Sequence, residues 1–444
     1  MKKTYIPVER ITGRDLPPVL RIFWNQTDNQ NFQIGNLLTA LTCFCAMSPR
    51  LTFNYVYDGR HALHHLLVQL CVVGQSSDGK SFSRNIYKLL CKPLLDKDKE
   101  AEIAELEYAE MKRTKSQNKD KPKEPITVKI CLIKFTKNKI IKRSHMMFRK
   151  YAEPLTFMIF TDELSTLVER RGSYGDLRDI GKLAYDWGSE TSVDTNSDAS
   201  YNCTTDINWC SIYNTTPAIL YKYIDKDACE SGNVNRMTFV MLGDLLGEPA
   251  PKYHEITDSE MALIREWQDK LMAETYTPQD NLQPMHEVPM EWLHKDEEAW
   301  CDAQREIIGK TCSNAHNSFY KRCSTSAARF ATMAYHLWGE DPKQRPHIRK
   351  LYYYLADYIL KGQLKLFGKM FEQHVVNIDY SDAGGDENAP LYDQMPKRFT
   401  RDMLKAKVDE LKLGTKARQF IFKWLRKRLI FEVEGEKDVY EKLY

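Results

Sequence analysis

One octapeptide, GQSSDGKS at residues 74–81, constrains this chain more than any other stretch. It matches G-x-x-x-x-G-K-[ST] at every fixed position and follows the apolar run at residues 66–73. An apolar strand that ends in such a turn and opens a helix is the setting in which this pattern binds a nucleotide. Backbone N–H groups surround the phosphates, and the positive end of the helix adds to the anion site. The sequence therefore predicts a phosphate-binding loop (P-loop), with a plain glycine turn before a surface helix as the alternative.

The residues of this loop have separate expected roles. Lys80 would reach the β- and γ-phosphates, and the Ser81 hydroxyl would take one position on Mg²⁺. We expect ATP and Mg²⁺ as cofactors. The expected nucleotide-binding residues are Gly74, Gln75, Ser76, Ser77, Asp78, Gly79, Lys80, Ser81 and Phe82.

Size and composition exclude several protein classes. A chain of 444 residues is too long for one ordinary core, and 42% hydrophobic with 28% charged residues is typical of a globular protein without membrane spans. No run reaches the roughly 20 apolar residues that span a bilayer, and the first residues lack the apolar core of a signal peptide. Eleven cysteines without a regular frame favour reduced thiols in the cytoplasm. Neither Cys43/Cys45 nor Cys203/Cys210 has zinc-ligand spacing, and His61, His64 and His65 are better explained by a turn or helix–strand junction than by a metal.

The alternation of apolar and polar segments predicts an α/β fold with a mostly parallel sheet flanked by helices. We expect a charged insertion within the P-loop core to be a solvated excursion whose first half is an amphipathic helix, with a DNA-contacting hairpin as the alternative. The expected divisions are a helical lead-in and first strand at 1–60, a P-loop NTPase core at 61–256 with the insertion at 96–124, a helical region at 257–380, and a winged-helix-like domain at 396–444.

Two strand ends supply the polar groups that hydrolysis needs. The run LTFMIFTDE at 155–163 ends in Asp162, which would hold Mg²⁺ through water, and Glu163, which would polarise the attacking water. Asn214 follows the strand at 209–213 and would sense the γ-phosphate. The alternatives are an exposed acidic turn for the first pair and an Asx or Ser/Thr turn before Pro217 for the second.

An arginine in trans would complete such a site. Arg236 stands immediately before the apolar strand at 237–242 and would project towards a neighbouring subunit's nucleotide. Arginine fingers contribute on the order of 10³–10⁵ in rate. An ordinary surface arginine is the alternative, and Arg345 and Arg349 are weaker candidates for a second sensing arginine.

The tail is basic and has the element order of a winged helix-turn-helix. We expect helices at 400–410 and 415–428, then strands at 429–433 and 437–440. Phe420 and Trp424 are expected in the small domain's core. Cations on these helices suit phosphate contacts with DNA, with a solvated helix face as the alternative. The expected DNA-binding residues are Arg401, Lys405, Lys416, Arg418, Lys423 and Lys427.

The order of these blocks over about residues 15–250 resembles the YfjI-like primase–helicase-type P-loop ATPases of bacterial mobile elements and prophages, especially of Bacteroides-type genomes. The matching blocks are Tyr57-Asp58-Gly59, the P-loop, Asp162-Glu163, the Asn214–Pro217 segment and Arg236. The resemblance implies an AAA+/RecA-like core, related to superfamily 3 motors, that forms a homo-oligomer such as a hexamer on single-stranded or forked DNA. Because the chain begins almost at the ATPase, it also implies that any primase partner is a separate polypeptide.

The function expected from these features is Mg²⁺-dependent ATP hydrolysis that drives DNA unwinding, translocation or remodelling in the replication or transfer of a mobile element. Two other classes stay open. One is an ATP-operated switch or assembly factor, in phage defence or transposition, that does not translocate. The other is a non-catalytic DNA-binding protein that recruits a replication complex. We expect no membrane association.

Overall fold

The computed structural model describes most of the chain. The described ranges are 7–8, 10–57, 62–114, 123–133, 136–165, 177–186, 190–193, 203–225, 228–229, 232–243, 245, 247–249, 251–372, 389–413, 416–426, 429–433 and 435–442.

A five-stranded, entirely parallel sheet forms the centre of the fold, in the order β4-β5-β8-β3-β9. This confirms the expected α/β class. Because all pairings are parallel, the carboxyl ends of the strands lie along one edge of the sheet. The strands are β3 (Gln69–Val73), β4 (Cys131–Leu132), β5 (Thr156–Thr161), β8 (Asn208–Thr215) and β9 (Met237–Met241).

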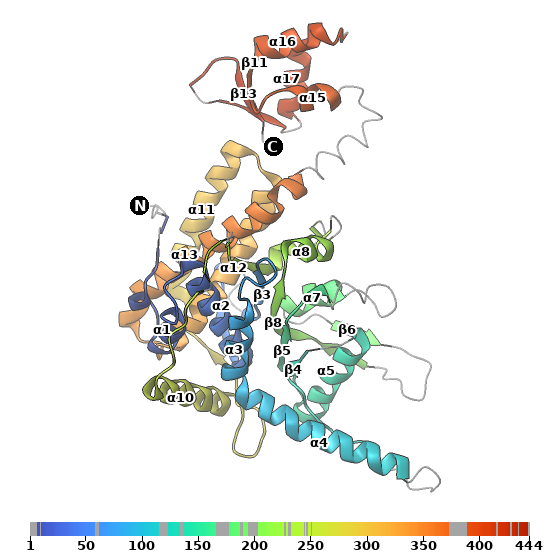
Figure 1. The fold of residues 1–444 in the computed structure, drawn as a ribbon, viewed down its shortest axis with the longest axis vertical. Helices are drawn as coiled ribbons and strands as arrows, with labels where there is room; N and C mark the ends of the chain where they lie inside the picture. The colour runs from blue at the N-terminus through green and yellow to red at the C-terminus, as the bar shows by residue number, and fades with distance from the viewer. Residues whose placement is uncertain are drawn as a thin grey trace.

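Helices cover both faces of this sheet (Figure 1). On β9, Val240 lies against Gly35 of α2 (Gln30–Met47), and the preceding Phe239 lies against Gly362 of α13 (Arg345–Gln363). Consecutive residues of a strand point to opposite faces, so α2 and α13 pack on opposite sides of the sheet. Every residue of α2 from Phe32 to Met47 is buried. The expected lead-in helix therefore lies in the core.

The helical region expected after residue 256 shares its core with the sheet. One cluster of buried apolar side chains runs from Ile11 to Phe367, across the boundaries expected near 60 and 256. Gln363 of α13 donates to the Met237 carbonyl at 2.9 Å, and Arg329 donates to the Leu67 carbonyl. The helices involved are α1 (Pro18–Trp24), α10 (Asp258–Thr275), α11 (His294–Thr311) and α12 (Asn314–His336).

Smaller elements complete this body. Residues 194–202 lie outside the described part. A small sheet has the order β10-β1-β2, and it places His64 and His65 on a strand; His61, Asp58 and Gly59 lie outside the described part. The elements are β1 (Leu51–Asn54), β2 (Leu63–His65), β6 (Glu190–Val193), β7 (Cys203–Asp206), β10 (His286–Glu287), α3 (Ser81–Leu90), α5 (Lys137–Tyr151), α7 (Leu177–Tyr185) and α8 (Pro217–Tyr223).

The first part of the charged insertion is helical, as expected, and its side chains are mostly exposed, but the start of the helix is anchored to the sheet. It belongs to α4 (Lys92–Thr114), which reaches away from the sheet in Figure 1. The Asp98 carboxylate accepts hydrogen bonds from the backbone N–H groups of Ile130 (2.8 Å) and Cys131 (2.6 Å), next to edge strand β4. A buried carboxylate that satisfies two backbone donors fixes the helix to the sheet. Residues 115–122 lie outside the described part.

The tail has a core of its own. Strands β11, β13 and β12 form an antiparallel sheet in that order, and helices α16 and α17 precede β12. Phe420 and Trp424 are buried in this core, as predicted. The elements are α15 (Ala389–Gln394), β11 (Arg398–Thr400), α16 (Arg401–Glu410), α17 (Ala417–Arg426), β12 (Ile430–Glu432) and β13 (Val439–Lys442).

Candidate nucleotide-binding site

The strand order brings three sequence motifs to one cavity. β8 lies between β3 and β5, so its carboxyl end stands between the P-loop and the acidic pair. The cavity has a volume of about 540 Å³. Its polar lining comes from Ser76, Ser77, Gly79, Lys80 and Ser81 of the loop, Asp162, Glu163 and Ser165 after β5, and Thr215 and Thr216 at the end of β8.

The P-loop has a closed conformation that depends on its glycines. Gly79 has φ +75°, the left-handed region that favours glycine. A Cβ atom on Gly74 would lie 3.0 Å from both the Asp78 carboxylate and Leu242. The Gly74 N–H donates to the Thr215 carbonyl at 3.2 Å, and the Gln75 N–H donates to Asp78. Gln75 and Asp78 thus hold the loop's shape.

Lys80 lies folded against the loop. Its Nζ donates to the carbonyl oxygens of Gly74, at 3.0 Å, and Gln75. Burial lowers the pKa of Lys80, and the negative charges of Asp78 and Glu163 oppose that effect. Helix α3 begins at Ser81, as the sequence predicts, so its amino end faces the same cavity.

Phe82 contributes to the site differently from the other expected residues. Its ring is buried and packs edge-on against Phe32, with 5.6 Å between ring centroids. The side chain therefore stabilises the junction of α2 and α3 and does not line the cavity.

The acidic pair lies on the cavity, and one of its members is already paired. Arg84 of α3 donates from Nε to Asp162 Oδ1 at 2.8 Å, and its terminal nitrogen lies 2.7 Å from Oδ2. Glu163 is exposed and accepts a hydrogen bond from Ser165 at 3.3 Å. The sequence analysis missed Arg84. Its spacing of three from Ser81 on a helix that starts at the loop was the available signal.

The end of β8 presents different residues from those expected. Asn214 is buried, and its Oδ1 accepts a hydrogen bond from the Ser83 hydroxyl at 2.9 Å. Side chains alternate along a strand, so the next residue, Thr215, points the other way and lines the cavity together with Thr216. Asn214 thus connects β8 to α3 behind the loop.

Arg236 lies at the opposite end of the strands from the cavity. It precedes Met237, which pairs with Gln69, the first residue of β3, so it stands at the amino ends of the strands. Its guanidinium donates to Asp186 at 2.7 and 3.1 Å, and Asp186 also accepts from Arg322 at 2.6 Å. Arg236 does not line the cavity of its own chain.

The two other arginine candidates belong to the helical region. Arg349 donates to Asp296 at 2.7 Å, and the Arg345 guanidinium lies 5.3 Å from the centre of the Trp292 ring. Neither residue lines the cavity. These contacts explain both arginines by packing within the helical region.

The cations of the tail are largely exposed. Lys405, Lys416 and Arg418 are exposed, Lys423 is half-buried, and Arg401 lies 3.8 Å from Asp438. Lys427 lies outside the described residues. Phe422, with 70% of its surface exposed on α17, adds an apolar ring beside these charges.

Comparisons with known proteins give little further information. No family model matches the chain, and no curated protein matches it. Among solved structures the chain is similar to Cch of SCCmec type IV, titled an active helicase, with a TM-score of 0.34 and 12% identity over 98% of this chain and 70% of that one. In the described part of the chain, no helix has the length and apolar character needed to cross a membrane.

Proposed function

We propose that this chain is a Mg²⁺-dependent ATPase of helicase type that unwinds, translocates along or remodels DNA during replication or transfer of a mobile element. One observation carries the proposal: the P-loop, the acidic pair and the end of β8 line a single cavity. A phosphate-binding loop alone indicates a nucleotide. An acidic residue beside it adds the means to activate water.

The residues that line the cavity would have separate roles in binding and hydrolysing ATP. The loop N–H groups, the amino end of α3 and Lys80 would hold the phosphates. Ser81 and Asp162 offer the hard oxygen donors that Mg²⁺ prefers, so this donor set suits that ion, which when bound neutralises charge on the phosphate oxygens. Glu163 would orient the attacking water and accept its proton. Thr215 and Thr216 would take the sensing position expected of Asn214.

The tail supports DNA as the partner. Its two helices followed by two paired strands have the order expected of a winged helix, in which α17 would be the recognition helix. Exposed cations on both helices suit phosphate contacts, and Phe422 lies where a base could stack. The order of the sequence motifs resembles that of the YfjI-like primase–helicase-type ATPases, and this resemblance supports DNA as the partner.

The environment of Arg236 favours a second candidate, an ATP-operated switch that does not translocate. As an arginine finger in a ring, Arg236 would have to exchange or share its ion pair with Asp186 when a neighbouring subunit docks. If no neighbour docks, the pair stays within the chain and the site turns over slowly. Both candidates use the same cavity.

The test is ATP turnover by the purified full chain with and without single-stranded DNA, together with the mass in solution by light scattering. We expect DNA to raise turnover severalfold and ATP with DNA to raise the mass to that of a ring. Glu163→Gln should still bind ATP but lose most turnover, by roughly 10²–10⁴-fold. Glu306→Gln, an exposed carboxylate on α11, is the matched control and should change nothing.

The outcomes separate the candidates. Equal turnover with and without DNA, at constant mass, would reject the motor and leave the switch. If Lys80→Ala binds and hydrolyses ATP like the wild type, the cavity is not the nucleotide site. If Arg236→Ala forms rings but loses turnover, the arginine acts in trans.

A further inference from the structure

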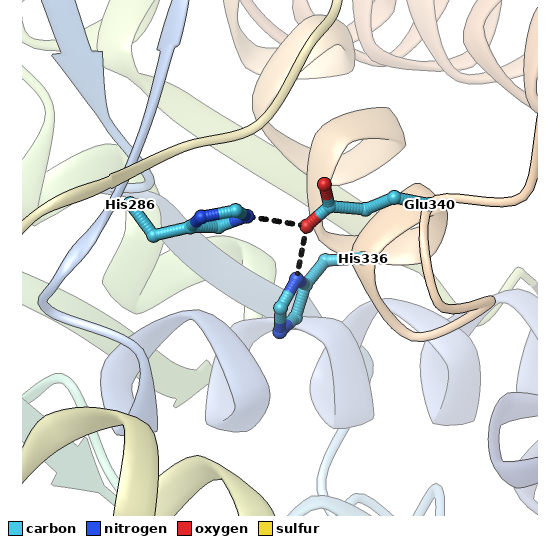
Figure 2. A group of neighbouring side chains, drawn as sticks. All are labelled: His286, His336 and Glu340. Carbon is cyan, nitrogen blue, oxygen red and sulfur yellow. Dashed lines mark hydrogen bonds and ion pairs between the residues drawn. The ribbon is translucent and has the colours of Figure 1, made fainter.

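A second cluster of chemically active side chains lies in the helical region. His286 of β10, His336 at the end of α12 and Glu340 after it converge on one point (Figure 2). Glu340 Oε1 lies 2.6 Å from His286 Nε2 and 2.8 Å from His336 Nδ1. The three potential ligand atoms lie within 4.8 Å of one another. The proposed ATPase activity makes no use of this cluster.

The backbone holds two of these residues in place. The Glu340 N–H donates to the Tyr335 carbonyl at 3.0 Å and the Gly339 N–H to the His336 carbonyl at 2.7 Å, the bonds of a Schellman-type helix end. Gly339 has φ +70°, as this turn requires, and Glu340 itself has φ +58°. A non-glycine residue is uncommon in this region, and such residues concentrate at ligand sites. The turn aims the Glu340 carboxylate back at His336.

A fourth residue orients the buried histidine. His336 Nε2 lies 2.8 Å from the carboxylate of Glu274 on α10. A carboxylate on one ring nitrogen fixes the proton there and leaves the other nitrogen with its lone pair free for a ligand. Here the nitrogen left for a metal would be Nδ1, which lies 2.8 Å from Glu340 Oε1. Metal-binding histidines commonly have such a carboxylate behind them.

The cluster is reachable from solvent. It borders a cavity of about 640 Å³, which Arg50, Lys270 and Gln283 also line. The His286 side chain is 51% exposed, whereas His336 is 6% exposed. An ion could therefore enter from the cavity, and water from the cavity could supply a ligand that the protein does not.

We infer that His286, His336 and Glu340 form a binding site for a transition-metal ion, Zn²⁺ before others, with Glu274 as the carboxylate that orients His336. Two imidazole nitrogens and one carboxylate oxygen are ligands that Zn²⁺ accepts, with water completing four-coordination. Mg²⁺ and Ca²⁺ prefer all-oxygen sets, so this site discriminates against the ion proposed for the nucleotide. The ion would link β10 to the end of α12.

The competing explanation is a hydrogen-bonded network in which His336 carries a proton in place of a metal. Burial lowers the pKa of His336, but the hydrogen bonds to Glu274 and Glu340 outweigh it and raise the pKa overall. The same contacts satisfy either explanation. Only the metal explanation requires that all three ligand residues be present for an ion to be retained.

The test measures metal on the full-length chain purified without a histidine tag and dialysed against metal-free buffer. We expect about one zinc ion per chain by mass spectrometry. Adding Co²⁺ to chain first stripped by a chelator should give the visible absorption of a four-coordinate ion. The melting temperature should fall on chelation and recover with Zn²⁺. His286→Ala and Glu340→Gln should lose the retained ion and this response to chelator.

The matched controls are His254→Ala, an exposed histidine outside the cluster, which should retain the ion, and Glu274→Gln, which should weaken Zn²⁺ binding by roughly 10–100-fold without abolishing it. His286 is half exposed, so its alanine variant should fold, and its circular dichroism spectrum checks this. Wild-type chain without retained zinc, cobalt absorption or a chelator response would overturn the site. So would unchanged zinc in both His286→Ala and Glu340→Gln.

Discussion

At Gly74 the P-loop leaves no room for a side chain. The Asp78 carboxylate and Leu242 each lie 3.0 Å from where a Cβ atom would stand, and Asp78 holds the loop through the Gln75 N–H. Leu242 follows β9 and is buried, so it cannot withdraw freely. The loop's shape therefore depends on this glycine.

We predict that Gly74→Ala lowers the affinity for ATP by roughly tenfold to a hundredfold, because overpacking costs about 1–3 kcal/mol and falls on the binding conformation. Titration calorimetry with ATP measures the effect. Gly309→Ala is the matched control, since nothing lies within 4 Å of its added Cβ in helix α11. That variant should bind ATP normally and be slightly more stable. Normal ATP binding by both variants would contradict the prediction.

Glu297 is a buried acid, and its burial disfavours the ionised form of the carboxyl group. Burial raises its pKa to about 8, against the hydrogen bond that it accepts from the Val56 N–H at 3.2 Å. The unfolded chain ionises this group near its ordinary pKa of about 4.3, so between the two values the folded state binds more protons. The stability that the neutral form contributes is fully present below the pKa of the unfolded chain. It is lost as the pH rises through the pKa of the folded chain.

We predict that the wild-type free energy of unfolding falls by up to about 1.4 kcal/mol per pH unit from this group as the pH rises from about 5 to 8. Glu297→Gln should remove this component and be relatively more stable at pH 8. Urea denaturation at several pH values measures it. Glu306→Gln, exposed on the same helix, should keep the wild-type slope. A Glu297→Gln slope equal to the wild type would show that Glu297 ionises normally.

At the scale of elements, α4 illustrates how one carboxylate fixes a charged helix. Asp98 is buried and satisfies the N–H groups of Ile130 and Cys131 beside β4. Glu105 adds a contact to Arg143 on α5. These contacts join α4 to the sheet edge, although its Ile103 and Leu106 side chains remain exposed.

We predict that Asp98→Ala destabilises the chain by about 2–4 kcal/mol, because two buried backbone donors lose their acceptor. Asp96→Ala, two positions earlier and paired with exposed Lys92 and Lys99, should change the stability much less, because exposed ion pairs are screened by solvent. Chemical denaturation compares the two variants. Equal losses would mean that the Asp98 contacts do not hold α4 to the sheet.

At the scale of the whole molecule, the chain has two separate cores. One cluster extends from Ile11 to Phe367 and the other from Leu391 to Tyr440. Since each buries its own apolar side chains, the two parts should fold independently. The cavity thus lies in the part of the chain built around the first core, and the tail cations lie in the part built around the second.

We predict that a chain ending at residue 388 keeps its main thermal transition within a few degrees and binds ATP normally. It should lose most DNA affinity, together with the salt dependence that phosphate contacts give. Calorimetry and fluorescence anisotropy with labelled DNA check the two parts. Undiminished DNA affinity would place the DNA site in the larger core.

The sequence predicts those parts of the site that are local in the chain. The P-loop, the start of α3 at Ser81 and the acidic pair after β5 depend on neighbours within a few positions, and all three lie where expected. Arg84, Thr215 and the His286 cluster were missed, since each acquires its role from strand alternation or from a partner distant in sequence. The helix expected in the first half of the insertion forms, but its anchor at Asp98 was missed because the partners of Asp98 are more than thirty residues away.

The sequence alone determined that this chain is α/β, has a glycine-containing loop between a buried strand and a helix, and carries acidic side chains after a second buried strand. Glycine torsions, helix starts and apolar runs are properties of short segments. Only the tertiary structure decided that β8 lies between β3 and β5, that Asn214 faces Ser83 while Thr215 faces the cavity, and that Arg236 is paired with Asp186. Those outcomes depend on which strands pair and which faces are buried. Both are set by contacts between segments that are distant in the sequence.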